Sequence, residues 1–110
     1  ALARQLGDRR TEGQFLGHLA LSLARLDRVD AARQGLAGGL ALLEALTDTV
    51  SMGLLWCQRA EVEWLAGAPD AAWLALDAAE ALARECAAGT RSELGTALAR
   101  VRSQLPHRHA

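Results

Sequence analysis

The feature that most constrains this chain is an internal repeat with a period of forty residues. When Ala1–Leu40 is laid over Ala41–Glu80 without a gap, ten of the forty positions are identical. A third copy begins at Ala81, where Ala-Leu-Ala-Arg repeats the first four residues of the chain. A repeat of this length predicts a stack of similar supersecondary units, each of which buries its apolar face against its neighbours.

The composition favours helix in nearly every part of this repeat. Ala and Leu dominate, β-branched residues are few, and proline occurs only at positions 69 and 106. This mixture favours α-helix over strand. With 110 residues, of which 51% are hydrophobic, the chain is long enough for one domain with a buried core. We therefore expect a single all-α domain.

Capping and turn signals divide the chain into helices. We expect Gly7-Asp8 to break a truncated first helix, with Asp8 as the N-cap of the next helix, and Asp48 to repeat that role. Asp27 is expected to cap the helix that follows it. The clearest turn is Ala66–Asp70, with Gly just past one helix and Pro at the first position of the next. The expected helices span residues 9–25, 28–46, 50–65, 69–87 and 91–104.

The pattern of residues 90–105 predicts a helix that caps the end of the stack. Ala88-Gly89 is expected to end one helix, and Thr90 followed three residues later by Glu93 is a capping box for the last one. The exposed face of this helix is polar, as a terminal repeat requires because nothing stacks beyond it; it carries Arg91, Arg100, Arg102 and Gln104. The predicted organisation is the end of a truncated helix at 1–8, repeats at 9–46 and 48–87, a capping helix at 90–105 and a tail at 106–110.

Apolar residues recur at helical spacing within the expected helices and predict their buried faces. Gly35, Gly38 and Gly39 each reduce helix propensity by about 1 kcal/mol relative to Ala. We expect close approach of the neighbouring helix to compensate for these glycines. The predicted inward residues are Leu16, Leu19, Ala20, Leu23, Val29, Ala32, Leu36, Leu40, Leu43, Leu55, Trp56, Ala60, Val62, Ala72, Leu76, Ala79, Leu82, Leu94, Ala97, Leu98, Val101 and Leu105.

The helix pair from Leu16 to Leu40 resembles a tetratricopeptide repeat. That motif has a bulky residue, then Leu-Gly, then an aromatic residue in its first helix, and Ala-x-x-x-Phe in its second. The corresponding residues are Leu16, Leu19-Ala20, Leu23, Ala32 and Leu36 in the first copy, and Trp56, Arg59-Ala60, Glu63, Ala72 and Leu76 in the second, with Gly67 at the turn.

Two features distinguish this chain from the usual motif. Its period is forty residues instead of thirty-four, as in the long-repeat branch of the family, and Arg59 and Glu63 replace apolar consensus residues. Armadillo and HEAT repeats share the period but fit the Gly and Ala spacing less well. The resemblance implies antiparallel helix hairpins stacked as a right-handed α-solenoid with a C-terminal capping helix. The sequence texture is similar to repeat arrays of large bacterial multidomain signalling proteins.

The resemblance also implies a function. In tetratricopeptide arrays the first helix of each repeat lines a concave groove that binds a peptide or a partner helix, so we expect a protein-interaction scaffold with no cofactor. The chaperone-binding members hold a C-terminal carboxylate with Lys and Asn, and this chain contains neither residue type. The groove residues carried over from the family are Gln14, Gly17, His18, Leu21, Arg25, Leu54, Cys57, Gln58, Glu61 and Leu65.

Trp64 and Trp73 match no position of the family motif and have two interpretations. Tryptophan is enriched at binding hot spots, so both residues are candidate interface anchors. The alternative is that they pack between helices or cover a turn.

Two other roles remain open beside groove binding. The segment could be a structural array terminator, or a homodimerisation module that uses the apolar edge left by its truncated N-terminal helix, near Leu2 and Leu6. Nucleic-acid binding is the weakest hypothesis. The net charge is −1, and the twelve basic residues interleave with thirteen acidic ones instead of forming a basic face.

The remaining chemistry-bearing residues argue against catalysis and metal binding. Cys57 and Cys86 lie in apolar helical patterns and form no disulfide framework, which favours a reduced, cytoplasmic setting. No apolar run approaches the roughly 20 residues that a membrane span needs. His107 and His109 lie in the tail without a cysteine at ligand spacing. Cys57 and His18 would need a third orienting group for covalent catalysis, so we expect no enzymatic activity.

Overall fold

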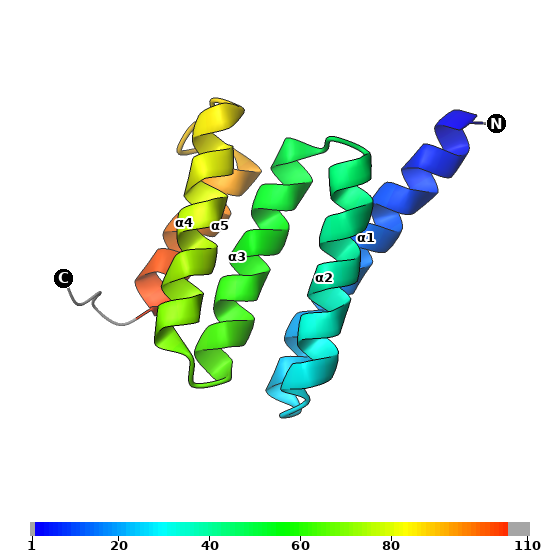
Figure 1. The fold of residues 1–110 in the computed structure, drawn as a ribbon. Helices are drawn as coiled ribbons and strands as arrows, with labels where there is room; N and C mark the ends of the chain where they lie inside the picture. The colour runs from blue at the N-terminus through cyan, green and yellow to red at the C-terminus, as the bar shows by residue number, and fades with distance from the viewer. Residues whose placement is uncertain (1, 106–110) are drawn as a thin grey trace.

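The computed structural model describes residues 2–105, apart from the side chains of residues 2–4 and 6. This part of the chain is all-α, as predicted, with five helices and no strand. The helices are α1 (Leu2–Arg25), α2 (Val29–Ala45), α3 (Thr49–Leu65), α4 (Pro69–Glu85) and α5 (Glu93–Gln104) (Figure 1). The predicted tail with His107 and His109, and the side chains of Leu2 and Leu6, lie outside the described residues.

Successive helices run antiparallel, and α3 lies at the centre of the arrangement (Figure 1). Helices α1 and α2 form one hairpin, and α3 and α4 form a second. Helix α3 also packs against both helices of the first hairpin, and α5 packs against both helices of the second. The molecule measures 48 × 33 × 18 Å, so it is flattened to about the thickness of two packed helices.

Four turns of the same kind separate the helices. In each one, a residue in the left-handed region ends the helix, and these residues are spaced twenty apart. They are Asp27, Thr47, Gly67 and Ala87, with φ of 62°, 52°, 77° and 52°. At the third turn, Gly67 N–H bonds to Trp64 C=O and Ala68 N–H bonds to Glu63 C=O, and the other three turns repeat these bonds. This is the Schellman pattern, in which two free carbonyls of the helix end are satisfied.

Four of the ten residue pairs that the two sequence repeats share are buried in both copies. The pairs Ala20 and Ala60, Ala32 and Ala72, and Leu36 and Leu76 are all at most 1% exposed. Their side chains belong to two apolar clusters, one formed by α1, α2 and α3 and the other by α3, α4 and α5. These shared residues therefore place equivalent small and apolar side chains in both clusters.

Gly39 lies at a close crossing of α1 and α2. A Cβ atom at position 39 would lie 3.0 Å from the carbonyl oxygen of Gly13 and 3.3 Å from Leu16 Cβ. At Gly35 and Gly38 the nearest atoms would lie 3.7 Å away, which is ordinary contact. The expected close approach is therefore confirmed at Gly39, while its two neighbouring glycines leave room for a side chain.

Two further glycines lie where one helix unit meets the next. A Cβ atom on Gly17 of α1 would overlap Gln58 Oε1 of α3 and would lie 2.7 Å from Leu55 Cδ1 of the same helix. In the same way, a Cβ atom on Gly53 of α3 would lie 2.7 Å from Leu94 Cδ2 of α5. Leu55 is 3% exposed and Leu94 is 1% exposed. The space that the missing side chain leaves is thus occupied by Leu94 at Gly53, and by Leu55 together with the Gln58 carboxamide at Gly17.

The charged residue at position 63 has a structural partner. The Glu63 carboxylate is only 2% exposed, and Arg33 of α2 donates to both of its oxygens, with Nη2 to Oε1 at 2.6 Å and Nε to Oε2 at 3.1 Å. Arg59 Nε lies 3.7 Å from Oε2 on the other side. Glu63 therefore replaces an apolar consensus residue with an ion pair that joins α2 to α3, because a buried carboxylate must be paired.

The predicted helix break at Gly7-Asp8 is wrong. Helix α1 continues from Leu2 to Arg25, and Asp8 lies inside it with an exposed side chain instead of capping a new helix. Gly in a helix costs about 1 kcal/mol relative to Ala, which lowers stability without ending a helix whose other residues are helix formers. The Thr11 hydroxyl also donates to the Gly7 carbonyl at 3.0 Å, within the unbroken helix.

The cap predictions had a mixed outcome. Asp48 is the N-cap of α3, as predicted, and accepts from Ser51 N–H. The Asp27 prediction is wrong because Asp27 takes the left-handed position of its turn; the N-cap is Arg28, which makes no side-chain cap bond. The Thr90 prediction is also wrong, since the Ser92 hydroxyl accepts from Gly95 N–H at 3.0 Å and α5 begins at Glu93. Helix α4 was predicted to end at residue 87 but ends at residue 85, because Ala87 takes the left-handed position of the turn that follows.

All predicted inward residues are buried or partly buried except Leu19. Leu19 is 39% exposed, and Phe15, one turn earlier, is 60% exposed. Both lie on a face of α1 that packs against no other helix of the described chain, since α2 and α3 contact its other side.

The two adjacent glycines of α2 should respond to alanine with opposite signs. Gly39→Ala is expected to lower the free energy of unfolding by about 1–3 kcal/mol, because the new Cβ would press on the α1 backbone. Gly38→Ala is expected to raise it by up to about 1 kcal/mol, because the site is exposed and Ala is the better helix former. Urea unfolding followed by circular dichroism measures both values, and effects of the same sign would contradict this account of the crossing.

Candidate functional site

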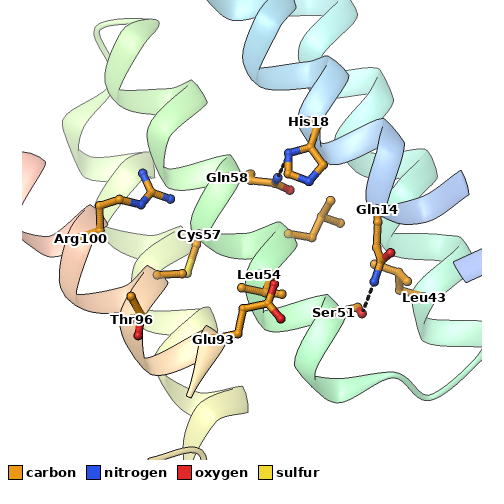
Figure 2. A pocket seen from close by; sticks show the side chains of 12 residues that line it. Gln14, His18, Leu43, Ser51, Leu54, Cys57, Gln58, Glu93, Thr96 and Arg100 are labelled. Atoms are coloured by element: carbon orange, nitrogen blue, oxygen red, sulfur yellow. Dashed lines mark hydrogen bonds between the residues drawn. The ribbon is translucent and has the colours of Figure 1, made fainter. Parts of the chain in front are cut away.

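A groove opens between α1, α3 and α5 on one side of the molecule (Figure 2). Its volume is about 350 Å³, which lies within the range of small binding sites. Helix α1 supplies one wall, α5 supplies the other, and α3 lies between them. The residues that line it are Gln14, His18, Leu43, Ser51, Leu54, Leu55, Cys57, Gln58, Glu93, Thr96, Ala97 and Arg100.

Five of the predicted groove residues come together here, namely Gln14, His18, Leu54, Cys57 and Gln58. Gln14 and His18 are one turn apart on α1, as are Leu54 and Gln58 on α3, so each pair shares one face of its helix. A hydrogen bond of 3.1 Å joins Gln58 Nε2 to His18 Nδ1, and Gln14 Nε2 donates to Ser51 Oγ at 3.1 Å (Figure 2). These side chains form a polar bridge between α1 and α3.

The other predicted groove residues lie elsewhere. Leu21 is partly buried and packs against the first core cluster. Arg25 and Leu65 are exposed near the ends of their helices and do not line the groove. Glu61 is 6% exposed, and its Oε1 forms an ion pair with Arg100 Nη1 of α5 at 2.8 Å. Glu61 therefore holds α5 against α3 instead of presenting a free carboxylate to a partner.

The wall formed by α5 was missed by sequence reasoning. Glu93, Thr96 and Arg100 line the groove, although the sequence was interpreted only as a terminal cap at these positions. The signal was the third repeat start at Ala81. Carrying the forty-residue register forward from it places Ala97 at the position of Cys57, and both residues line the groove.

The two tryptophans occupy different environments. Trp73 is partly buried and packs against the second core cluster, which agrees with the packing interpretation. Trp64 is 39% exposed near the end of α3 and does not line the groove.

Cys57 lies in the groove but does not have the properties of a nucleophile. It is 1% exposed, and burial raises the pKa of its thiol to about 12, so the thiol is protonated at neutral pH. Both cysteines are free. Among the residues that the structure describes, no three His, Cys, Asp or Glu side chains are grouped to hold a metal ion. None of the described helices is long and apolar enough to span a membrane.

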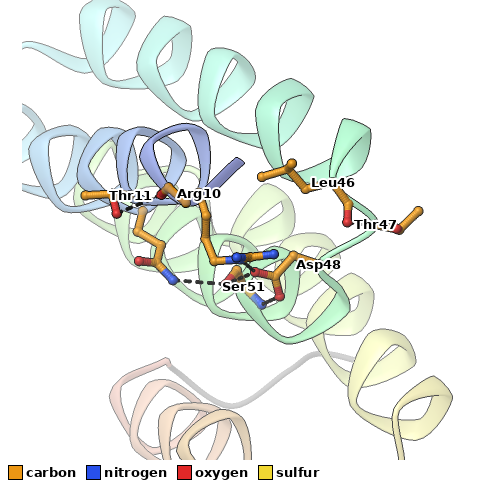
Figure 3. A network of polar contacts seen from close by, with 8 residues as sticks. Arg10, Thr11, Leu46, Thr47, Asp48 and Ser51 are labelled. Atoms are coloured by element: carbon orange, nitrogen blue, oxygen red, sulfur yellow. Dashed lines mark hydrogen bonds and ion pairs between the residues drawn. The ribbon is translucent and has the colours of Figure 1, made fainter. Parts of the chain in front are cut away.

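Asp48 holds the end of the groove where α1 crosses α3 (Figure 3). Its carboxylate accepts from Ser51 N–H at 3.1 Å and from Ser51 Oγ at 2.8 Å, and it pairs with Arg10 Nε of α1 at 2.6 Å. Burial alone would raise the pKa of Asp48, but the hydrogen bonds from Ser51 and Arg10 outweigh it and hold the pKa below its ordinary value. Ser51 in turn accepts from Gln14 in the groove.

The Asp48 carboxylate should contribute stability that depends on pH. Because the folded pKa lies below the unfolded one, this contribution is present above the ordinary pKa of about 4 and is lost as the pH falls through the folded pKa. Asp48→Asn keeps a capping side chain and removes the charge, so we expect it to lower the free energy of unfolding by about 0.5–1 kcal/mol at pH 7. Denaturant unfolding from pH 7 to pH 3 should show this difference shrinking, and a constant difference would contradict the prediction.

Comparisons with models of protein families, with curated proteins and with solved structures found no match to this chain. A function for this protein must therefore rest on the geometry and chemistry of its own surfaces, and the groove combines apolar, amide, hydroxyl and charged side chains.

Proposed function

We propose that this protein is an interaction scaffold of the tetratricopeptide type and that its groove binds a peptide segment of a partner protein. One observation carries the proposal: α1, α3 and α5, which are separated in sequence, supply all but one of the residues that line a single groove of about 350 Å³, the exception being Leu43 of α2. Two of its wall residues, His18 and Gln58, are equivalent positions of the forty-residue repeat and bond to each other.

The helix packing supports a short solenoid. The first helix of each unit packs against both helices of the unit before it, as α3 does against α1 and α2, and as α5 does against α3 and α4. The four Schellman turns keep the units in the same relative geometry. In such a stack the first helices lie side by side, and α1, α3 and α5 supply every residue that lines the groove except Leu43 of α2.

The chemistry of the groove favours a peptide segment without acidic side chains, since Glu93 adds an exposed carboxylate to its wall. Leu54, Cys57 and Ala97 provide apolar surface, while the carboxamides of Gln14 and Gln58 can both donate and accept hydrogen bonds. The backbone N–H and C=O groups of a peptide can form hydrogen bonds with these carboxamides. An apolar side chain of the peptide would pack against Leu54, Cys57 and Ala97. Arg100 is already paired with the buried Glu61 and does not offer an isolated positive charge.

The proposal is tested with a displayed library of random peptides selected on the immobilised protein. The dissociation constant of a selected peptide is then measured for the wild type and for a Gln14→Ala, Gln58→Ala double variant. We expect binding to weaken by roughly tenfold or more, since each lost hydrogen bond costs about 0.5–1.5 kcal/mol. Glu61 is left unchanged because its removal would leave Arg100 without its partner.

The matched control is Gln34→Ala, which removes an exposed carboxamide from α2, outside the groove. It should bind the peptide as the wild type does. Failure to select any peptide, or equal weakening by Gln34→Ala and by the groove variant, would count against a peptide-binding groove.

A further inference from the structure

Arg100 and Glu93 line the groove with charged side chains, and only the charge of Arg100 is compensated. Arg100 pairs with the buried Glu61 carboxylate, with Nη1 and Oε1 2.8 Å apart. Glu93 is exposed, and none of the ion pairs between described residues includes it. Figure 2 shows its side chain extending from the start of α5 into the space between α5 and α3. The described wall of the groove therefore presents a negative charge without a partner.

The backbone that carries Glu93 is held in place on both sides. The next residue, Leu94, is 1% exposed and packs against α3. On the other side, the Ser92 hydroxyl donates to the Gly89 carbonyl at 2.7 Å and accepts from Gly95 N–H at 3.0 Å. The carboxylate is thus presented from a fixed helix start, so a ligand that pairs with it orders no loop on binding.

A carboxylate in the first turn of a helix also interacts favourably with the helix dipole. Glu93 has this position in α5, and Asp70 has it in α4. Asp70 is exposed as Glu93 is, but it does not line the groove. The dipole accounts for an acidic residue at either helix start, and Asp70 is therefore the matched control for a role of Glu93 in the groove.

The spacing of the α5 wall determines the register of a peptide that runs along it. Glu93 and Ala97 are one helical turn apart, which is about 6 Å along the axis of α5. In an extended peptide, side chains two residues apart point to the same side and are separated by about 6.6 Å. A side chain placed at Glu93 is therefore followed, two residues away, by one placed over the apolar surface of Ala97, Cys57 and Leu54.

We propose that the groove selects an extended peptide in which Arg or Lys stands two residues from an apolar side chain, with the basic group paired to Glu93. This assignment rests on the proposed function of the groove and adds the class of peptide that it takes. A guanidinium or ammonium group forms a charge-assisted hydrogen bond with the carboxylate, whereas an acidic side chain at the same place is repelled. Glu93 is then a specificity-determining residue.

The first measurement is the sequence bias among displayed random peptides selected on the immobilised protein. Selection on the wild type should enrich Arg or Lys two positions from an apolar residue, relative to the unselected library. Selection on Glu93→Lys should reverse the preference at the charged position, toward Asp and Glu, because the wall now repels a cation. The same basic preference on both proteins would overturn the proposal.

The second measurement compares one selected basic peptide with the same peptide carrying glutamine in place of the basic residue. Glu93→Gln should raise the dissociation constant of the basic peptide about twofold to fivefold, as expected for an exposed ion pair, and should leave that of the glutamine peptide unchanged. The effect should shrink as the salt concentration rises. Asp70→Asn should bind both peptides as the wild type does, and equal weakening by Asp70→Asn would overturn the assignment to Glu93.

Charge selection and peptide binding by the groove fail in different ways. Peptides that bind through Gln14 and Gln58, without a basic preference and with equal affinity for the wild type and Glu93→Gln, would overturn charge selection and leave the peptide groove in place. Selection that yields no groove-dependent peptide would overturn both. Circular dichroism should show the same helix content for Glu93→Gln as for the wild type, because the side chain is exposed and glutamine is also a good helix former.

Discussion

Contact between a buried leucine and a glycine of the neighbouring helix is the interaction on which the rest of this structure depends. Leu55 of α3 lies on Gly17 of α1, and Leu94 of α5 lies on Gly53 of α3. Each glycine gives up about 1 kcal/mol of helix propensity, and each leucine removes an apolar side chain from water, which stabilises by about 1.5–3 kcal/mol. The burial of the leucine therefore outweighs the helix propensity lost at the glycine. This contact also determines how closely consecutive helix units approach.

This spacing produces the groove that is proposed to bind a peptide. Because consecutive first helices meet at the same kind of contact, α1, α3 and α5 lie side by side and their polar side chains line one groove. The twenty-residue recurrence of the left-handed turns starts α2, α3 and α4 two residues after each turn, whereas α5 begins six residues after the last one. On α1, Phe15 and Leu19 are exposed, since no other helix of the described residues covers that face.

The sequence predicted what depends on local pattern and repetition. The all-α class, the helix pairs, the Asp48 cap and the core pairs such as Leu36 and Leu76 follow from periodicity and from the repeat. What it missed depends on contacts between distant segments. The Glu61–Arg100 pair and the α5 wall arise only when α5 docks on α3. One local signal was also misleading. Gly7 indicated a helix break, but α1 continues through it because the residues around it favour helix.

The central claim is tested most directly by a double-mutant cycle at Gly53 and Leu94, measured by urea unfolding. In the wild-type background, Gly53→Ala should destabilise the protein by about 1–3 kcal/mol, because the new Cβ would overlap Leu94. In a Leu94→Ala background the space is free, so the same substitution should stabilise the protein by up to about 1 kcal/mol through helix propensity. A change of sign between the two backgrounds would support the leucine-on-glycine contact as the element that spaces the helices. Additive effects, with Gly53→Ala equally costly in both backgrounds, would contradict it.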